Sequence, residues 1–199
     1  MPPTPLTTAP GAALIVIDVQ RGFSDDSVWR FPNNPALESN IAALLHAWQS
    51  AGAPIVVVRH DSSEPESTLR PGQSGNDLID DVVAAAADLL VTKDVNSAFV
   101  GTPDLAHWLR SRGIAQIVVC GISTNTCVET TARMGQNLGF DVLFALDATR
   151  AFALTGSDGT TLSADELTRA TAVNMSASGF ARIALTAELS AAIAGGVPA

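Results

Sequence analysis

VVCGISTNTCVETTARMG, residues 118–135, joins a run of small apolar residues to a segment with helical periodicity. Such an apolar run is typical of a strand that is buried on both faces of a sheet. Between the two segments lie a glycine, several hydroxyl and amide side chains and Cys127. The stretch therefore predicts a junction between a strand and a helix, with a thiol near the start of the helix.

The same alternation of apolar runs and helical segments continues on both sides of this junction. Strands are expected at 13–18, 54–60, 89–93, 116–121 and 141–149, with a possible last strand at 181–189. Helices are expected at 35–52, 103–113, 124–139 and 163–179, and the piece at 77–88 is helical or irregular. Alternation of this kind predicts βαβ units, so we expect an α/β fold with three layers: a mostly parallel sheet with helices on both faces.

Length and composition favour one globular domain. The chain has 199 residues, of which 47% are hydrophobic and 16% are charged, and its net charge is −9. We expect a tail at 1–11, a single domain at 12–190 and a second tail at 191–199. The negative charge argues against nucleic-acid binding, and no apolar run reaches the ~18 residues of a membrane span. The expected partner is a small-molecule substrate.

The cysteines and the first residues bear on the compartment. Cys120 and Cys127 are neither a Cys-x-x-Cys pair nor a disulfide framework. The first residues lack the basic segment and apolar core of a signal peptide. The sequence therefore predicts a reducing, cytoplasmic location.

Polar side chains follow several expected strands, at the edge where ligands bind in open α/β sheets. These residues are Asp18, Arg59, His60, Lys93, residues 121–127 and Asp147. An acid, an amine and a thiol are thus expected at one edge of the sheet.

This set of residues could carry out nucleophilic chemistry. The start of a helix favours a thiolate, so the pKa of Cys127 is expected to be lowered, with help from Lys93. Asp18 could accept the thiol proton and later deliver it to a leaving group. Taken singly, Asp18 could instead cap a turn and Lys93 could be a solvated surface residue. Cys120, inside an apolar strand, is expected to be an inert core residue.

Three segments resemble the isochorismatase-like cysteine hydrolase family. They are IDVQRGF (17–23), KDVNSAFVGT (93–102) and GISTNTCVETTARMG (121–135), and they occur in the family's order. The resemblance extends over most of residues 12–185.

The resemblance implies a triad of Asp18, Lys93 and Cys127 on a six-stranded parallel sheet flanked by helices. It also implies a cis peptide bond between Ile122 and Ser123. This bond would direct the Ser123 N–H, beside the Cys127 N–H, at a developing oxyanion. Family members are commonly dimers or larger assemblies, so a homo-oligomer (dimer or tetramer) is expected.

The sequence departs from the family's nicotinamidases at their metal motif. Those enzymes hold a metal through Asp-x-His and a further His, whereas residues 59–72 place His60 before Asp61 and contain no second His. His46 and His107 fall on expected helices, as surface or packing residues. We therefore expect no metal and no cofactor, and nicotinamide is a disfavoured substrate.

Several residues near the triad could contact a substrate. The candidates are Gln20, Phe23, Trp29, Phe31, Phe99 and Thr126. The aromatic rings could sandwich a flat substrate, or they could pack in the core or between subunits. Gln20 could hydrogen-bond a substrate or an adjacent loop, and Asn125 is expected to cap the helix rather than line the pocket.

The expected function is hydrolysis of a C–N bond of amide type through a cysteine acyl-enzyme. Two alternatives stay open: an isochorismatase-type vinyl-ether hydrolase, and a binding protein that keeps the fold without turnover. A flavodoxin-like redox module is disfavoured, because no glycine-rich phosphate loop follows the first strand. The irregular segment 61–77 is either functional or a solvated surface loop.

Overall fold

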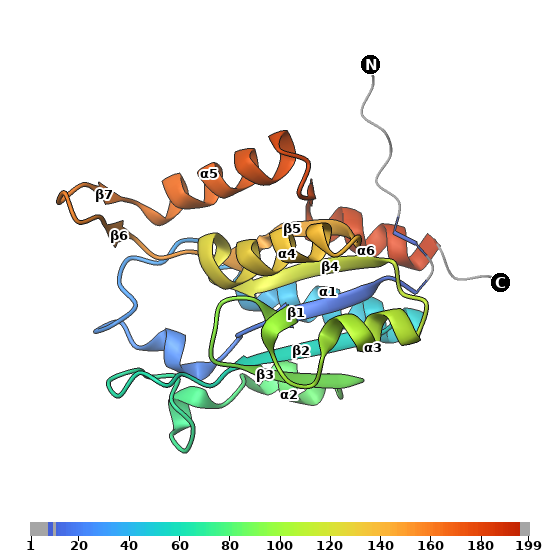
Figure 1. Ribbon diagram of the computed structural model, residues 1–199, viewed down its shortest axis with the longest axis horizontal. Helices are drawn as coiled ribbons and strands as arrows, with labels where there is room; N and C mark the ends of the chain where they lie inside the picture. The colour runs from blue at the N-terminus through green and yellow to red at the C-terminus, as the bar shows by residue number, and fades with distance from the viewer. Residues whose placement is uncertain (1–7, 10, 196–199) are drawn as a thin grey trace.

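A six-stranded parallel sheet forms the centre of the computed structural model, which describes residues 8, 9 and 11–195 (Figure 1). Its strand order is β3-β2-β1-β4-β5-β8. The strands are β1 (Ala13–Ile17), β2 (Ile55–His60), β3 (Leu89–Lys93), β4 (Gln116–Ile122), β5 (Asp141–Arg150) and β8 (Arg182–Ala184). All five pairings in the sheet are parallel, which confirms the expected fold class.

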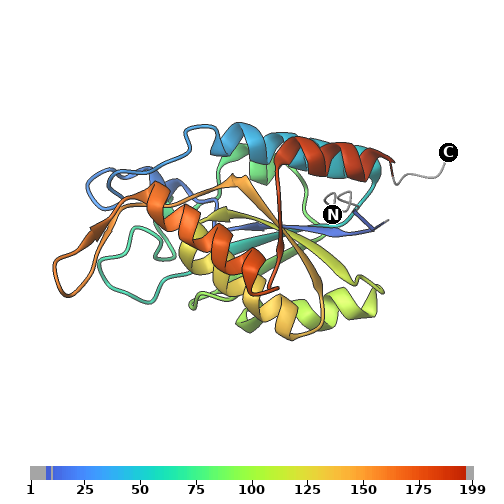
Figure 2. The same cartoon turned by 90° about the horizontal axis from the view of Figure 1, so that it is seen from above.

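Helices cover both faces of this sheet (Figure 2). One face carries α1 (Leu37–Ala51), α2 (Asp80–Ala84) and α6 (Thr186–Gly195). The other carries α3 (Leu105–Ser111), α4 (Glu129–Asn137) and α5 (Ala164–Ala177). Each face has its own hydrophobic core, and β1 supplies Leu14 and Val16 to one and Ile15 and Ile17 to the other. Burial on both faces is why β1 is continuously apolar.

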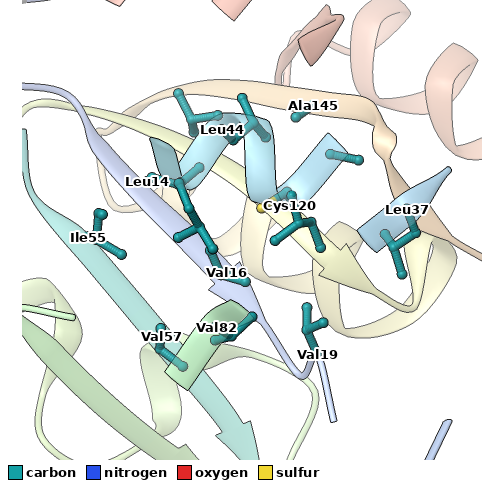
Figure 3. Close-up of a cluster of buried hydrophobic side chains, with 14 of the residues drawn as sticks. Leu14, Val16, Val19, Leu37, Leu44, Ile55, Val57, Val82, Cys120 and Ala145 are labelled. Carbon is teal, nitrogen blue, oxygen red and sulfur yellow. The ribbon is translucent and has the colours of Figure 1, made fainter. Parts of the chain in front are cut away.

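Cys120 lies in the first of these cores, as its position in an apolar strand predicted. Its side chain lies beside aliphatic residues of β1 and α1 (Figure 3). Complete burial raises the pKa of this thiol far above its usual range. The residue is therefore an unreactive packing group.

Gly121 brings β4 close to β1 next to the end of both strands. Its φ of +117° lies where residues with a side chain are strained, and a Cβ here would meet the Ile17 carbonyl oxygen. Ile17 and Gly121 are register partners, and Asp18 follows directly. The glycine thus sets the spacing between the Asp18 segment and the segment that carries Cys127.

The C-terminal part of the chain differs from the expectation. Residues 181–189 were expected to be a strand, but β8 has three residues and α6 begins at Thr186. Leu189 and Ile193, four positions apart, pack α6 into the core beside α1, so the tail expected at 191–199 is helical as far as Gly195. Leu189 and Ile193 among alanines form a helical pattern. The alternation of apolar and polar residues just before it is typical of a strand, and this led to the wrong prediction.

Smaller differences concern other segments. A hairpin of β6 (Leu154–Thr155) and β7 (Thr161–Leu162) was not expected. The helix expected at 124–139 starts with a π-helical turn, Thr124–Val128, before α4. Most of the expected tail at 1–11 lies outside the described residues, but Thr8 is buried and the Ala9 N–H donates to Gln116 Oε1 at 2.6 Å. None of the helices in the described residues is long and apolar enough to cross a membrane.

The helix start at Ser163 has the capping box that its spacing to Glu166 predicted. Ser163 Oγ accepts from the Glu166 N–H, and the Ser163 N–H donates to Glu166 Oε2 at 2.8 Å. Ser163→Ala is therefore expected to lower the free energy of unfolding by about 1 kcal/mol. Denaturant titration measures this loss, and Ser157→Ala, in the exposed hairpin turn, is the control expected to change it by less than about 0.5 kcal/mol. Equal effects of the two substitutions would contradict the capping role.

Candidate active site

The carboxyl ends of three parallel strands bring Asp18, Lys93 and Cys127 together. Asp18 directly follows β1, Lys93 is the last residue of β3, and Cys127 lies in the π-helical turn after β4. Lys93 Nζ donates to Asp18 Oδ2 at 2.6 Å and lies 3.5 Å from Cys127 Sγ. The three residues that the sequence singled out are thus in direct contact.

Lys93 is the only lysine in the sequence, and its side chain is fully buried together with that of Asp18. Its ammonium also lies 3.1 Å from His60 Nδ1. Because an ammonium can only donate, Nδ1 is the acceptor and the imidazole proton is on Nε2. Burial, together with the positive charge of Lys93, lowers the pKa of His60 to about 4, so His60 is neutral at pH 7. Lys93 therefore links a carboxylate, a thiol and an imidazole.

The two carboxylate oxygens of Asp18 have different surroundings: one accepts from the Lys93 ammonium, and the other has no partner among the described residues. Burial raises the pKa of Asp18 to about 6, against the attraction and hydrogen bond of Lys93. The carboxyl group is therefore mostly ionised at pH 7. Its Oδ1 is buried and has no hydrogen-bond partner among the described residues. Its backbone φ of +53° is unusual for a residue with a side chain, and such conformations cluster at functional sites.

The Cys127 thiol keeps its proton in this structure. Burial raises its pKa to about 12, the negative charge of Asp18 adds to the rise, and Lys93 opposes it. The expectation of a lowered pKa is therefore wrong, because burial and the negative charge of Asp18 raise the pKa more than Lys93 lowers it. The sulfur also lies 3.7 Å from Asn96 Oδ1 as a weak donor. A reaction at this sulfur needs a base in contact with it.

The turn before Cys127 has the backbone that the resemblance implied. The peptide bond between Ile122 and Ser123 is cis. Ser123 precedes the first helical turn, accepts the Thr126 N–H at 3.1 Å, and its Oγ lies 2.5 Å from Thr126 Oγ1. The expectation that Asn125 caps the helix is wrong, because Ser123 occupies the N-cap and Asn125 lines the cavity beside Cys127.

A cavity of about 250 Å³ opens beside Cys127. Three segments gather at this end of the sheet: the chain after β1, the loop after β2 and the β6–β7 hairpin (Figures 1 and 2). The cavity is lined by Asp18, Phe23, Trp29, His60, Leu69, Asn96, Ser123, Asn125, Thr126, Cys127, Phe152 and Leu154. Lys93 lies behind this surface, so it can act on the cavity only through the groups that it contacts.

One side of the cavity is an aromatic wall, made of Phe23, Trp29 and Phe152. Their ring centroids are 4.5–5.9 Å apart, and Phe23 and Phe152 are nearly parallel, with 14° between their planes. Trp29 Nε1 donates to Thr68 Oγ1 at 3.1 Å. Because the rings pack on one another, they form one surface and do not sandwich a substrate as two separate plates.

Three of the predicted substrate contacts do not line the cavity. Gln20 is buried, and its amide spans the backbones of His60 and Asn76, so it holds an adjacent loop. Phe31 is 68% exposed and lies away from the cavity. Phe99 stacks on Phe140 in the core, with 5.6 Å between ring centroids.

Sequence reasoning missed four residues of the cavity: Leu69, Asn96, Phe152 and Leu154. Leu69 lies in the loop 61–77, which is therefore a wall of the cavity and not only a surface loop. Asn76 fixes this loop, since its Nδ2 contacts His60 O, Asp61 Oδ1 and Leu69 O. Asn96 is three residues after Lys93, inside the segment that carried the resemblance, so its spacing could have pointed to it.

Asp18, His60 and Cys127 also form the one set of possible metal ligands within the described residues. Their ligand atoms lie within 4.8 Å of one another. Lys93 Nζ contacts all three of them, so a positive charge already fills the space between these atoms. A metal ion here would have to displace the ammonium. His46 and His107 are exposed on α1 and α3, far from this set in the sequence.

Solved structures resemble the whole described fold. A protein assigned to the isochorismatase family, from Chromobacterium violaceum, is 38% identical with a TM-score of 0.90, covering 97% of this chain and 99% of its own. A cysteine hydrolase from Pseudomonas syringae pv. phaseolicola is 25% identical with a TM-score of 0.83, covering 97% and 99%. The fold is therefore shared over nearly the full length of both chains.

Sequence comparisons agree with the structural ones. An isochorismatase family protein of Bacillus subtilis is 38% identical over 148 residues, which is 74% of this chain and 78% of that protein. Nicotinamidase 3 of Arabidopsis thaliana is 30% identical over 154 residues, 71% of this chain and 74% of its own. The model of the isochorismatase domain matches residues 12–185. With a matching fold and family model, the chain belongs to the isochorismatase family of hydrolases.

Proposed function

We propose that the protein is a cysteine-dependent hydrolase that cleaves the C–N bond of a small amide. The observation that carries this proposal is the contact between Asp18, Lys93 and Cys127 at the inner end of a small cavity. The similarity to a cysteine hydrolase and to a nicotinamidase supports both parts of it. The geometry provides a nucleophile, a base and a fixed counter-ion.

In the first half of the reaction, Cys127 Sγ adds to the amide carbonyl while Asp18 takes the thiol proton. The unpartnered Oδ1 of Asp18 is the acceptor, because Oδ2 already holds the Lys93 ammonium. The N–H groups of Ser123 and Cys127 stabilise the oxyanion. Asp18 then gives its proton to the departing nitrogen, which leaves as ammonia or an amine and leaves an acyl thioester on Cys127.

In the second half, Asp18 takes a proton from water as the water oxygen attacks the thioester carbonyl. The carbon–sulfur bond breaks, Cys127 regains the proton from Asp18, and the carboxylic acid leaves. Lys93 keeps Asp18 ionised between these two transfers. Losing one oxyanion donor typically costs about 10²–10³ in rate, so the backbone at Ser123 should matter more than its hydroxyl.

A panel of small amides, ureides and lactams, with release of ammonia or amine as the readout, tests the proposal. Mass spectrometry after rapid acid quench should find an acyl group on the peptide that contains Cys127, and hydroxylamine should remove it. Iodoacetamide should stop turnover. Amide hydrolysis that survives full alkylation of Cys127 would contradict the thiol nucleophile, whereas the vinyl-ether alternative predicts no release of ammonia or amine from any compound of the panel.

The pH dependence of kcat/KM reports which group must be ionised. Asp18, with a pKa of about 6, has to be deprotonated to act as the base. We therefore expect kcat/KM to rise about tenfold per pH unit below 6 and to level off above it. Since the pKa of Cys127 is about 12, no second rise is expected near pH 8.5, where an ordinary thiol titrates.

The single lysine offers an independent measurement of the same ionisation. Protein labelled with 13C at the lysine ε-carbon gives one side-chain resonance, that of Lys93. Its chemical shift should move with a midpoint near pH 6 as Asp18 ionises at 2.6 Å from the ammonium. A rise in kcat/KM that follows a pKa near 8.5, with no matching change in this resonance, would point to thiolate formation and contradict the role of Asp18.

Assembly as a dimer or tetramer stays a prediction, which analytical ultracentrifugation tests.

A further inference from the structure

We propose that the substrate of this cavity is an uncharged amide with an apolar acyl group, and that amides carrying a carboxylate are excluded. The proposal rests on the function proposed above, because it concerns the same cavity. It is carried by the side chains around Cys127, of which one group is apolar and the other is polar but uncharged apart from Asp18.

The apolar side of the cavity faces the acyl group of a substrate. It consists of the aromatic wall (Phe23, Trp29 and Phe152) with Leu69 and Leu154. Apolar atoms of a ligand that contact these side chains leave water at no cost in lost hydrogen bonds, whereas a carboxylate placed there would lose its hydration. This side of the cavity therefore favours substrates whose acyl group is a hydrocarbon.

The polar side has dipoles but no cation. Its members are His60, Asn96, Ser123, Asn125 and Thr126. His60 is neutral, since its Nδ1 accepts from Lys93 and its pKa is about 4, so Nε2–H is a neutral donor. Neutral donors and acceptors suit the C=O and N–H groups of an amide. They do not supply the charged partner that a buried carboxylate needs.

The less exposed cations near the cavity are engaged by carboxylates, whereas Arg30 and Arg70, next to the lining residues Trp29 and Leu69, are exposed and do not line it. No arginine or lysine is among the described residues that line it. Lys93 is paired with Asp18, Arg59 forms two hydrogen bonds with Asp61, and Arg150 forms two with Glu38. A carboxylate on the substrate would therefore enter a space in which Asp18, the ionised group among the described lining residues, has the same sign of charge and already holds the Lys93 ammonium.

The size of the cavity limits the acyl group. Its volume of about 250 Å³ equals about eight water molecules at ~30 Å³ each. A short aliphatic or a monocyclic carboxamide fits such a space. Larger amides would have to extend past Leu154, which is 49% exposed at the hairpin.

Matched pairs of amides test the charge selection. Butanamide and succinamate differ by a terminal methyl group against a carboxylate, and benzamide and 4-carbamoylbenzoate differ by one ring carboxylate. We expect kcat/KM for the neutral member of each pair to exceed that of the charged member by at least tenfold, on the order of what a missing buried partner costs. A charged member that is cleaved as well as its neutral partner, or better, overturns the proposal.

A new cation at the mouth of the cavity should weaken this selection. Leu154→Arg places a guanidinium beside the aromatic wall, and we expect the ratio of neutral to charged kcat/KM to fall by about tenfold. Val173→Arg is the control: Val173 is 58% exposed on α5 and does not line the cavity. An unchanged ratio in Leu154→Arg, or an equal fall in both variants, counts against the proposal.

Binding measurements separate this proposal from the catalytic one. Trp29 lies in the cavity wall, so its fluorescence should respond to the same four amides, and Trp29→Phe gives the background from Trp48 and Trp108. Tighter binding of the neutral amides without any turnover would support the charge selection and refute the hydrolase. Cys127-dependent turnover that prefers the charged amides would support the hydrolase and refute the charge selection. Failure of both neutral amides to bind or react at millimolar concentration overturns the substrate class.

Discussion

Cys127→Ala is expected to abolish amide hydrolysis, with a loss in kcat of about 10⁴-fold or more. The substitution removes the atom that forms the thioester, while Asp18, Lys93 and the cavity remain. Because Cys127 is 8% exposed and its side chain is small, the fold should tolerate alanine, and circular dichroism should show an unchanged spectrum. Ammonia release from the best amide of the panel measures the loss.

Cys120→Ala is the matched control for this experiment. It also removes a buried thiol, but one that lies in the hydrophobic core on the opposite face of the sheet from the Cys127 cluster. We expect it to keep most of the activity and to lose about 1 kcal/mol of the free energy of unfolding. Near wild-type hydrolysis by Cys127→Ala would show that the sulfur is not the nucleophile, whatever the effect of Cys120→Ala.

Lys93→Met has the second largest expected effect, because it leaves Asp18 buried without its counter-ion. The chain length is kept and the charge is lost, so the pKa of Asp18 should rise further above its present value of about 6. At pH 7 the carboxyl group is then mostly protonated and cannot accept the thiol proton. We expect kcat/KM at pH 7 to fall at least about 10²-fold and its rising limb to move to higher pH.

The stability of Lys93→Met should depend on pH in a defined direction. A carboxyl group whose pKa is raised in the folded protein stabilises the fold at low pH, and this stabilisation is lost as pH rises through the folded pKa. Near pH 4 Asp18 is protonated in both proteins, so the variant should show no deficit there. The deficit in unfolding free energy should grow above pH 6, where the wild-type carboxylate has its ammonium and the variant has none, towards the 3–5 kcal/mol that is typical of a broken buried pair.

Arg21→Met is the control for this loss of charge. Arg21 pairs with Asp80 at 2.7 Å, but both side chains are more than half exposed, at 52% and 91%. Water screens such a pair, so its loss should cost less than about 1 kcal/mol at every pH. If Lys93→Met showed an equally small and pH-independent deficit, Asp18 would not depend on Lys93 as proposed.

The fold could be predicted from the order of apolar runs, and the errors have local causes. Strands β1, β2, β4 and β5 each contain a buried run of four or more apolar residues, so their sequences are unambiguous. The strand predicted at 181–189 was wrong because only three residues form β8, and α6 begins almost directly after them. The β6–β7 hairpin has only two residues in each strand, and its leucines are exposed, so it carries no pattern of burial.

The sequence by itself determined which groups lie at the edge of the sheet. Asp18, Lys93 and Cys127 each lie at or after the end of an apolar run, and parallel strands end at the same edge, so their common edge follows from chain order and strand direction. Their selection as one set came from the resemblance to the family. Their protonation states did not follow. The pKa of a thiol depends on everything that displaces water around it, and the residues that bury Cys127 come from segments far apart in the chain.

Only the tertiary structure decided which neighbours form the cavity. Phe23 and Trp29 line it, and Phe31, two residues further along, points to solvent, because a local turn rather than a repeating element sets the direction of each side chain. Phe152 and Leu154 reach the cavity from a segment more than 120 residues after Trp29 in the sequence. The position of a residue at the end of a regular strand follows from the sequence, whereas the position of a loop residue depends on long-range contacts. For this reason the meeting place of Asp18, Lys93 and Cys127 was predictable and most of the cavity lining was not.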